Sequence, residues 1–198
     1  MYLRPAFAET DTARIAGLIA ANPFGVLVTC GAAGMQASHV PFILLRQDDG
    51  IVVAGHLAAA NAQCAQFEGG AALAVFAGPH AYISPSWYRT QPAVPTWDYA
   101  AVHLHGHLQK LEGEALLEML RALSRGDAGF DLDALETGFR DPLLAGIRGF
   151  SLRAERIEAQ WKMSQNRSAA DREGVVAALR AGGEHAVADL VAATLAAG

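Results

Sequence analysis

Residues 78–99 read GPHAYISPSWYRTQPAVPTWDY, a rigid and aromatic stretch near the middle of the chain. It contains two of the three tryptophans, three of the four tyrosines and four of the eight prolines, and its only charged residues at neutral pH are Arg89 and Asp98. Proline restricts the backbone, and aromatic side chains offer flat apolar area with a polar tip. Such a stretch forms a buried corner, an oligomer interface or a wall that stacks on a flat ligand, and its composition leaves all three open.

Composition limits the class of protein. Of the 198 residues, 52% are hydrophobic and 18% are charged, so we expect a packed core rather than long disorder. No apolar run reaches the roughly 18 residues that span a bilayer, and the N-terminal sequence is not a secretory signal, so we expect a cytoplasmic protein. The net charge of −5 gives no bulk attraction to a polyanion. Cys30 and Cys64 form no CxxC motif and are interpreted as small core residues.

Hydrophobic periodicity predicts six or seven strands that are joined mostly by short turns. The strands are expected over 23–30, 35–46, 51–58, 72–78, 80–84, 100–112 and 147–163, with tight turns at 31–34 and 47–50. Helices are expected over 9–21, 113–125, 131–145 and 184–196, with a short helix in 58–70 and another helix capped by Ser168. The pattern predicts a mainly β (α+β) fold, an antiparallel barrel with peripheral and C-terminal helices. We expect one domain over 1–198, with the barrel in 1–165 and a helical extension in 166–198.

Three histidines alternate along the strand predicted at 100–112 and therefore share one face: His103, His105 and His107. Side chains two residues apart on a strand lie about 6.6 Å apart, close enough for two imidazoles to share a metal ion. Tetrahedral zinc needs further ligands, and the sequence signals neither a cysteine nor an acidic partner for them. We favour a half-exposed polar face and predict no metal site.

The sequence lacks the motifs of several common enzyme classes. Ser84 and Ser86 flank Pro85 but do not stand in a GxSxG elbow, and neither a GxGxxG fingerprint nor a Walker-type lysine loop is present. These findings disfavour hydrolases, P-loop proteins and Rossmann dehydrogenases. No catalytic residue is predicted.

Two sets of polar residues remain as candidates for ligand binding. His39 and His56 each lie in a mostly apolar strand, where a neutral imidazole suits either a heterocycle edge or a buried backbone contact. The segment QWKMSQNRS at 160–168 combines several donors, which suit a phosphate, a heterocycle edge, a helix start or a subunit contact. Taken singly, each favours a structural role.

Taken together, the motifs resemble the PaiB-type family of FMN-binding negative transcriptional regulators. The resemblance rests on PFGVLVT at 23–29, SHVPF at 38–42, GHLA at 55–58 with Asn61, GPHAYISPSWY at 78–88, VPTWDY at 94–99 and QWKMSQN at 160–166. It implies the FMN-binding split barrel shared with pyridoxamine-phosphate-oxidase-like flavoproteins, and homodimers with flavin at the subunit boundary. Asp98 departs from the family pattern, which usually has asparagine there.

The resemblance also implies roles for individual residues. The isoalloxazine ring is expected between the strands at 37–42 and 53–57, beside His39, Val40, Pro41, Phe42 and His56. A stacking wall is expected from Trp87, Tyr88 and Trp97, and Asn61 is expected to cap the short helix beside the site. The phosphate is expected among Ser84, Ser86, Lys162, Gln165 and Asn166.

The first functional hypothesis is therefore a homodimeric, FMN-binding transcriptional regulator. A flavin-dependent oxidoreductase or flavin reductase on the same barrel is the second, and a flavin-free interaction module is the third, because fold alone does not choose among them. DNA is a candidate partner, although the chain shows no helix-turn-helix signature and is acidic. The absence of an evident proton donor disfavours an enzyme.

Overall fold

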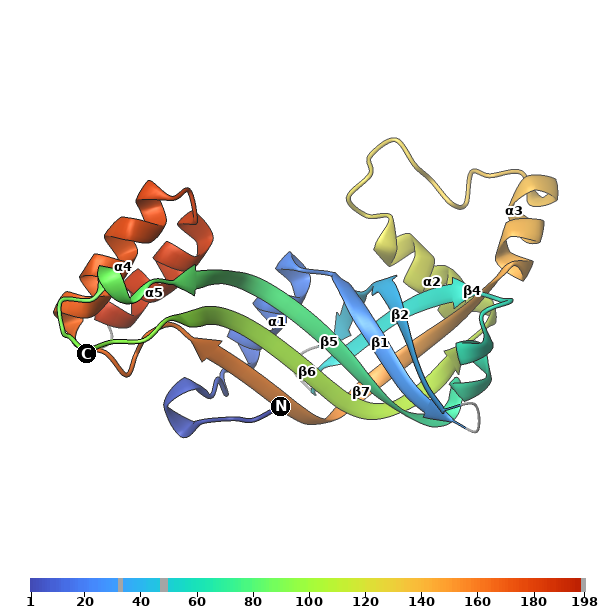
Figure 1. Cartoon of the computed structure of the whole chain (residues 1–198). Coiled ribbons are helices and arrows are strands. Elements are labelled where there is room, and N and C mark those ends of the chain that lie inside the picture. Colours follow the sequence, from blue (N-terminus) through green and yellow to red (C-terminus); the bar gives the residue numbers. More distant parts are fainter. Residues whose placement is uncertain (32–33, 47–49, 197–198) are drawn as a thin grey trace. The chain divides into compact units, whose positions relative to one another are not determined.

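The computed structural model describes residues 1–31, 34–46 and 50–196. Among these residues, seven strands form one antiparallel sheet in the order β2-β1-β5-β6-β7-β4-β3 (Figure 1). The strands are β1 (Phe24–Gly31), β2 (Gly34–Pro41), β3 (Ile43–Arg46), β4 (Val52–Ala58), β5 (Glu68–Ile83), β6 (Thr96–Leu111) and β7 (Ile147–Lys162). This is the predicted antiparallel split barrel.

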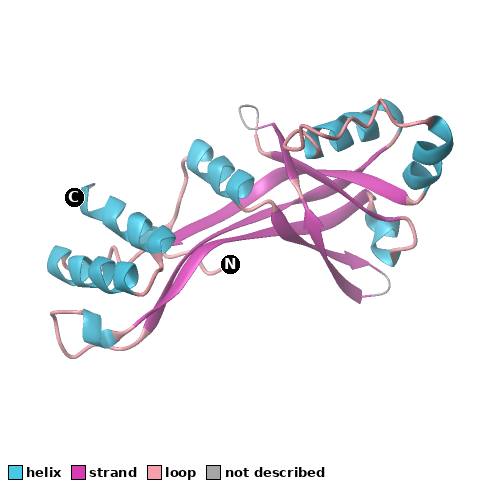
Figure 2. Cartoon of the chain, turned by 90° about the horizontal axis from the view of Figure 1, so that it is seen from above, coloured by secondary structure: helices cyan, strands magenta, loops and turns pink. Residues whose placement is uncertain are grey.

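The helices lie between and after these strands (Figure 2). They are α1 (Thr12–Ala21), α2 (Gly113–Leu123), α3 (Thr137–Ala145), α4 (Ala169–Ala181) and α5 (His185–Ala196), with short 3-10 helices η1 (Pro5–Phe7), η2 (Ala62–Gln66) and η3 (Pro85–Trp87). The predicted peripheral and C-terminal helices are thereby confirmed, although the helix predicted over 131–145 begins only at Thr137. No helix of the described residues is both long and apolar enough to cross a bilayer.

The chain separates into two compact units, and three strands contribute residues to both. Unit 1 comprises Met1–Asp11, Ala77–Val102 and Glu158–Gly198, and unit 2 comprises Thr12–Phe76 and His103–Ile157.

The core of unit 2 is built from aromatic side chains that come from four separate places in the sequence. The ring centroid of Phe42 lies 5.0 Å from that of Phe76 and 5.9 Å from that of Phe150. The ring centroids of Phe67 and Phe150 lie 4.9 Å apart. All four residues are buried. Edge-to-face contacts of this kind stabilise a core beyond the area that they bury.

Strand alternation decides which side chains of β6 enter this core. Leu104, Gly106 and Leu108 are buried, so the intervening histidines lie on the opposite face. A side chain at Gly106 would place its Cβ 2.1 Å from the carbonyl oxygen of Arg153, so only glycine allows β7 to approach this closely.

Several predicted strand boundaries are wrong. The strand predicted at 100–112 begins at Thr96, and the one predicted from residue 72 begins at Glu68. The segment 35–46 is not one strand but two, β2 and β3. The strand is interrupted at Phe42, whose N–H donates to the carbonyl of Pro23 at 2.8 Å. The segments 72–78 and 80–84 are not two strands but parts of β5. Proline interrupts a strand that is hydrogen-bonded along both edges, because it has no N–H to donate. On one edge of β5, β1 pairs only with residues 72–75, so Pro79 lies beyond that pairing.

The first hairpin has the predicted register. β1 pairs with β2 from Phe24↔Pro41 to Gly31↔Gly34, so the turn falls between these glycines. The turn residues 32–33, and residues 47–49 of the second predicted turn, lie outside the described residues.

In unit 1 the C-terminal helices form a hairpin that packs on η3. The side chain of Ser168 accepts the N–H of Asp171, which confirms the predicted cap of α4. A Cβ on Gly174 would lie 2.2 Å from the carbonyl oxygen of Trp87, so α4 and η3 meet backbone to backbone at this glycine.

Candidate functional site

Asn61 is the organising residue of a polar corner in unit 2. Its side chain accepts the N–H of Gln63 at 2.9 Å, which caps η2, and its amide donates to the hydroxyl of Ser38 at 3.1 Å. The predicted cap is therefore confirmed. The same side chain also joins the turn after β4 to β2, a link that sequence spacing alone did not indicate.

Two deeply buried polar atoms beside this corner have no hydrogen-bond partner among the described residues: Thr29 Oγ1 and Gln63 Oε1. Thr29 is 2% exposed and Gln63 is 1% exposed. The amide of Gln63 donates to the carbonyl of Leu27 at 3.0 Å, which fixes η2 against β1. A buried polar group without a partner costs about 1–3 kcal/mol, so each of these atoms is a candidate contact for a water molecule or a polar ligand group.

His56 contributes a third polar atom without a partner in unit 2. It pairs with Gly149 across β4 and β7, and its Nδ1 is buried with no partner among the described residues. Burial lowers the pKa of His56. A neutral imidazole both donates and accepts, as a heterocycle edge requires.

The predicted run from His39 to Phe42 divides between the two faces of its strand. His39 is exposed and stacks on Phe24, with ring centroids 5.8 Å apart and planes 14° apart. Val40 is buried and Pro41 is exposed. Phe42 is part of the aromatic core. These four side chains therefore do not share one surface, and any common role of the run involves its backbone.

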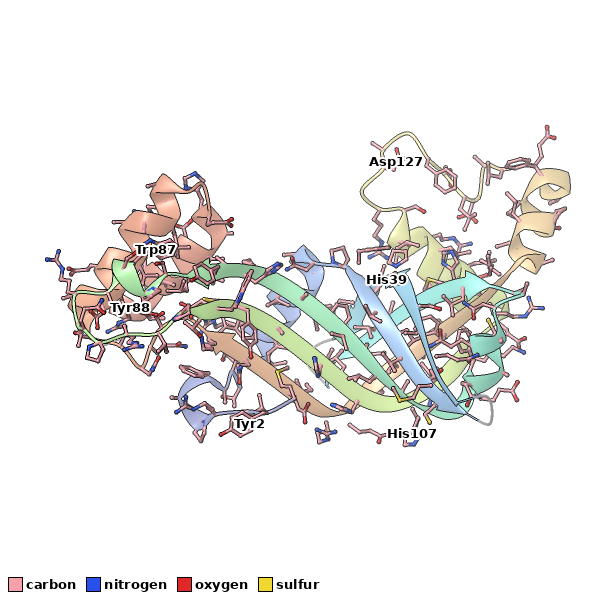
Figure 3. All side chains as sticks on the ribbon, in the orientation of Figure 1. Tyr2, His39, Trp87, Tyr88, His107 and Asp127 are labelled. Atoms are coloured by element: carbon pink, nitrogen blue, oxygen red, sulfur yellow. The ribbon has the colours of Figure 1, made fainter. Side chains whose placement is uncertain are left out.

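In unit 1, Tyr88 and Trp87 are packing residues at the contact between η3 and α4 (Figure 3). Tyr88 is buried, and the guanidinium carbon of Arg167 lies 4.4 Å from the centre of its ring. Trp87 is half-buried, with its carbonyl against Gly174. The face of Tyr88 that Arg167 covers is closed to a ligand.

Trp97 belongs instead to an exposed aromatic cluster in unit 1. It is 54% exposed, and its ring lies 6.3 Å from that of His80 and 6.1 Å, edge-on, from that of Tyr82. Tyr82 is itself 47% exposed. Sequence reasoning did not include His80 and Tyr82 in the site, although their alternation on one face of β5 could have indicated it.

Behind Trp97 lies a buried ionic cluster around Asp98. The carboxylate is fully buried, accepts the hydroxyl of Ser164 at 2.7 Å and lies 3.3 Å from the ammonium of Lys162. Burial raises the pKa of Asp98, and the contacts with Ser164 and Lys162 oppose this shift. Lys162 also donates to Thr96 Oγ1 at 2.7 Å and to the carbonyl of Trp97.

The residues predicted to bind the phosphate lie in unit 1, and four of the five have hydrogen-bond partners inside it. Lys162 is engaged as described above. The side chain of Gln165 accepts the N–H of Met163 and donates to the carbonyl of Trp161. The hydroxyl groups of Ser84 and Ser86 form a hydrogen bond with each other. Asn166 is exposed. Phosphate binding by these residues stays a prediction.

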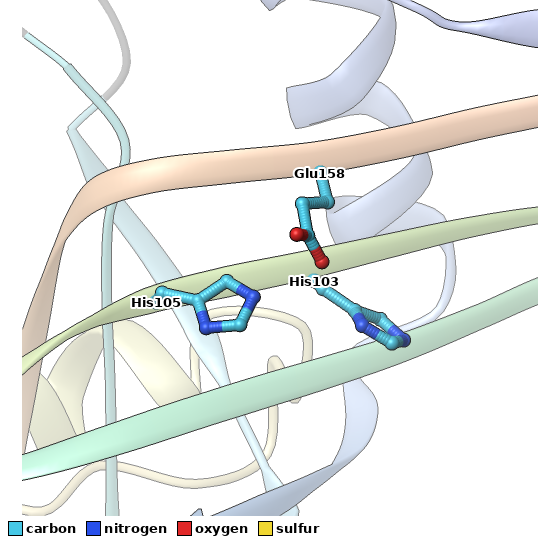
Figure 4. A group of neighbouring side chains, drawn as sticks. All are labelled: His103, His105 and Glu158. Carbon is cyan, nitrogen blue, oxygen red and sulfur yellow. The ribbon is translucent and has the colours of Figure 1, made fainter. Parts of the chain in front are cut away.

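The histidines of β6 lie on the face away from the core of unit 2. Figure 4 shows His103 and His105, whose ring centroids are 6.5 Å apart. The guanidinium of Arg156 lies 3.0 Å from His105 Nδ1, and Glu155 lies 2.8 Å from His107 Nδ1. These contacts agree with the predicted half-exposed polar face.

A family model described as "Putative FMN-binding domain" matches residues 1–156. The chain belongs to this FMN-binding family. Protease synthase and sporulation protein PAI 2 of Bacillus subtilis is 36% identical over 91% of this chain and 89% of its own length. The family assigns FMN as the cofactor.

Solved structures confirm the fold of this FMN-binding protein. The flavocytochrome Anf3 of Azotobacter vinelandii superposes with a TM-score of 0.64 over 81% of this chain and 72% of its own, at 14% identity. A FAD and heme binding protein of Mycobacterium smegmatis gives 0.61 over 78% and 72%, at 17% identity. At such identities the likeness establishes the fold alone.

The polar corner of unit 2 fits the edge of a flavin ring. The isoalloxazine system is flat and apolar in its centre and carries donors and acceptors at its rim. Thr29 Oγ1 offers a donor and an acceptor, and Gln63 Oε1 offers an acceptor, with neither atom engaged by the described residues. The donor set therefore matches the cofactor that the family assigns.

Proposed function

We propose that this chain is a homodimeric FMN-binding protein that acts as a PaiB-like negative regulator of transcription. The flavin part rests on one observation above all, the two buried polar atoms of Thr29 and Gln63 that no described residue satisfies. The regulatory part rests on the sequence motifs and on the Bacillus relative, whose name refers to sporulation.

Each residue of the polar corner has a separate role in this proposal. Asn61 links η2 to β2 through Ser38. Thr29 and Gln63 hydrogen-bond the polar rim of the ring once a local shift of η2 uncovers their buried atoms. Bound FMN supplies a redox-active ring. Burial of the corner excludes water, which strengthens each of these hydrogen bonds.

The C-terminal hairpin is not the element that contacts DNA in this proposal. Residues 169–196 contain four acidic and two basic side chains, a balance that repels phosphate. Regulation through DNA therefore involves another surface of the dimer.

The flavin proposal is tested by titrating the purified chain with FMN and following the visible spectrum of the flavin. Thr29→Val replaces the buried hydroxyl with a methyl group of similar shape. We expect FMN affinity to fall by up to about tenfold, the equivalent of one neutral hydrogen bond, and the apo chain to gain about 1 kcal/mol or more.

The matched control is Thr137→Val, the same change at an exposed position at the start of α3. It is expected to leave both FMN affinity and stability unchanged. Equal FMN affinity in Thr29→Val and the parent chain would show that the flavin does not bind at this corner. If no flavin binds even to the parent chain, the flavin proposal as a whole is wrong.

The regulatory part needs three further measurements. Light scattering of the purified chain is expected to give the mass of a dimer, and a monomer mass contradicts this part. A shift of promoter fragments at physiological salt supports repression by direct contact, and its absence counts against it. Rapid reduction of the flavin by NADH or NADPH in stopped-flow mixing would favour an oxidoreductase instead.

A further inference from the structure

A pocket of about 330 Å³ in unit 2 shares no lining residue with the polar corner. It is formed where α2 begins, between the end of β6 and the start of β7. Its volume falls within the range of small-molecule sites, about 300–1,000 Å³. Its apolar walls include Leu116, Leu144 and Ile147.

Two cationic side chains line this pocket, and only one of them has an acidic partner among the described residues. The ammonium of Lys110 lies 2.6 Å from Glu112, which also lines the pocket, and 3.8 Å from Glu68. Arg148 donates instead to two backbone carbonyls, those of Ala145 at 3.0 Å and Ile147 at 2.7 Å. Carbonyl contacts orient the guanidinium without neutralising its charge, so Arg148 is the cation of this pocket that can pair with an anionic ligand.

The start of α2 offers further hydrogen-bond donors, and the acidic residue of its first turn, Glu114, pairs with Arg121. Glu112 precedes the helix, but its side chain makes no capping hydrogen bond because it pairs with Lys110. The first N–H groups of a helix carry partial positive charge and lack partners within the helix. Gly113 lines the pocket at this point, so the open end of α2, Arg148 and Lys110 all surround one space.

We propose that this pocket binds a small carboxylate with a short apolar body. The carboxylate bridges the Arg148 guanidinium and the start of α2, since a planar fork of donors matches a carboxylate in two-point contact. The apolar body lies against Leu116, Leu144 and Ile147. An inorganic anion would make no apolar contact with these three side chains, and a neutral apolar molecule would leave Arg148 without a counter-ion.

This inference does not depend on the flavin proposal, and the two experiments have separate readouts. The probes are benzoate and hexanoate, with benzamide, hexanamide and inorganic phosphate as comparisons, each titrated into the full chain labelled with ¹⁵N. We expect both carboxylates to shift the amide signals of Gly113 and Leu116. The two amides and phosphate are expected to bind at least about tenfold more weakly, because each lacks one half of the recognition.

Two variants test the pocket by different means. Arg148→Gln removes the charge and is expected to weaken benzoate binding by about tenfold or more. Leu144→Trp fills the space but keeps both cations, and is expected to abolish binding. Arg125→Gln is the matched control, because Arg125 is exposed and does not line this pocket. Thermal unfolding of each variant verifies that it is folded.

Four results would overturn the proposal. One is unchanged benzoate affinity in Leu144→Trp, and another is equal binding of benzoate and benzamide to the parent chain. The third is displacement of benzoate by FMN in direct competition, which would make the pocket part of the flavin site. Flavin binding without any response to the carboxylates would also refute the pocket while leaving the flavin proposal intact.

Discussion

Two glycines within helices have opposite expected responses to the same substitution, because their surroundings differ. Gly17 in α1 has no atom within 4 Å of the position that a Cβ would occupy. Gly174 in α4 has the carbonyl oxygen of Trp87 at 2.2 Å. Alanine is favoured over glycine inside a helix by about 1 kcal/mol, so Gly17→Ala is expected to stabilise the chain by roughly that amount.

At Gly174 the higher helix propensity of alanine is outweighed by the steric clash of its Cβ with the carbonyl oxygen of Trp87. Contacts of a Cβ below 3.0 Å are essentially never observed, so α4 and η3 must separate by at least about 0.8 Å to relieve a contact of 2.2 Å. The obstacle is backbone, which does not rotate away as a side chain does. Overpacking of this kind costs about 1–3 kcal/mol, and we place Gly174→Ala at the upper end, for a net loss of about 1–2 kcal/mol.

Thermal unfolding followed by circular dichroism measures both changes. For a chain of this size 1 kcal/mol corresponds to about 2–4 °C in Tm, so Gly174→Ala is expected to lower Tm by roughly 2–8 °C and Gly17→Ala to raise it by roughly 2–4 °C. Hydrogen exchange is expected to show faster exchange in α4 for Gly174→Ala alone. An equal rise in Tm for both variants would refute the packing of α4 on η3, and with it the account of Trp87 and Tyr88.

Three further predictions concern single residues. Because the folded-state pKa of Asp98 is raised, the unfolded chain loses this proton first, and the free energy of unfolding declines as pH rises from about 4 through the folded pKa. Asp98→Asn removes this dependence, so its free energy of unfolding is expected to rise relative to that of the parent chain over the same pH window. Urea unfolding at several pH values measures the difference. Ser168→Ala removes the cap that accepts Asp171 N–H and is expected to lower the free energy of unfolding by about 1 kcal/mol, again in urea. Trp97→Ala is expected to change stability by less than about 1 kcal/mol because the ring is half-exposed, but to weaken FMN binding in a flavin fluorescence titration if Trp97 forms the stacking wall; unchanged affinity would remove it from the site.

The fold followed from local patterns wherever one pattern dominated. Alternation along β6 placed Leu104 and Leu108 inside and the histidines outside, and serine before a helical run located the start of α4. Two of the misplaced strand boundaries, at Pro41 and Pro79, occur where a proline gave the strongest local signal. Pro79 has little effect on β5 because β1 ends its pairing at Val75, a fact of tertiary pairing that residues 78–80 do not encode.

The candidate site was less accessible to sequence reasoning, because its polar contacts join residues far apart in the chain. Asn61 was predicted as a helix cap among the roles that the family resemblance implies, and that contact is local. Its second contact, with Ser38, crosses from one strand pair to another. Thr29 and Gln63 were not predicted at all, since a threonine in a strand and a glutamine in a short helix have no distinguishing pattern until both prove to be buried.

The stretch 78–99 combines the packing and exposed roles that its composition left open, and it assigns them to different residues. The carbonyl of Trp87 meets α4 at Gly174, and Tyr88 packs against Arg167 just before that helix, so the first half of the stretch is a packing element of unit 1. Asp98 is buried and Trp97 is exposed, although they are neighbours, because strand alternation turns successive side chains to opposite faces. Lys162 binds the carbonyl of Trp97 and the carboxylate of Asp98 together, and this fixes the backbone that carries the exposed ring. The ring itself is flanked by those of His80 and Tyr82, so backbone and neighbouring rings together reduce the freedom that Trp97 loses when a flat partner stacks on it.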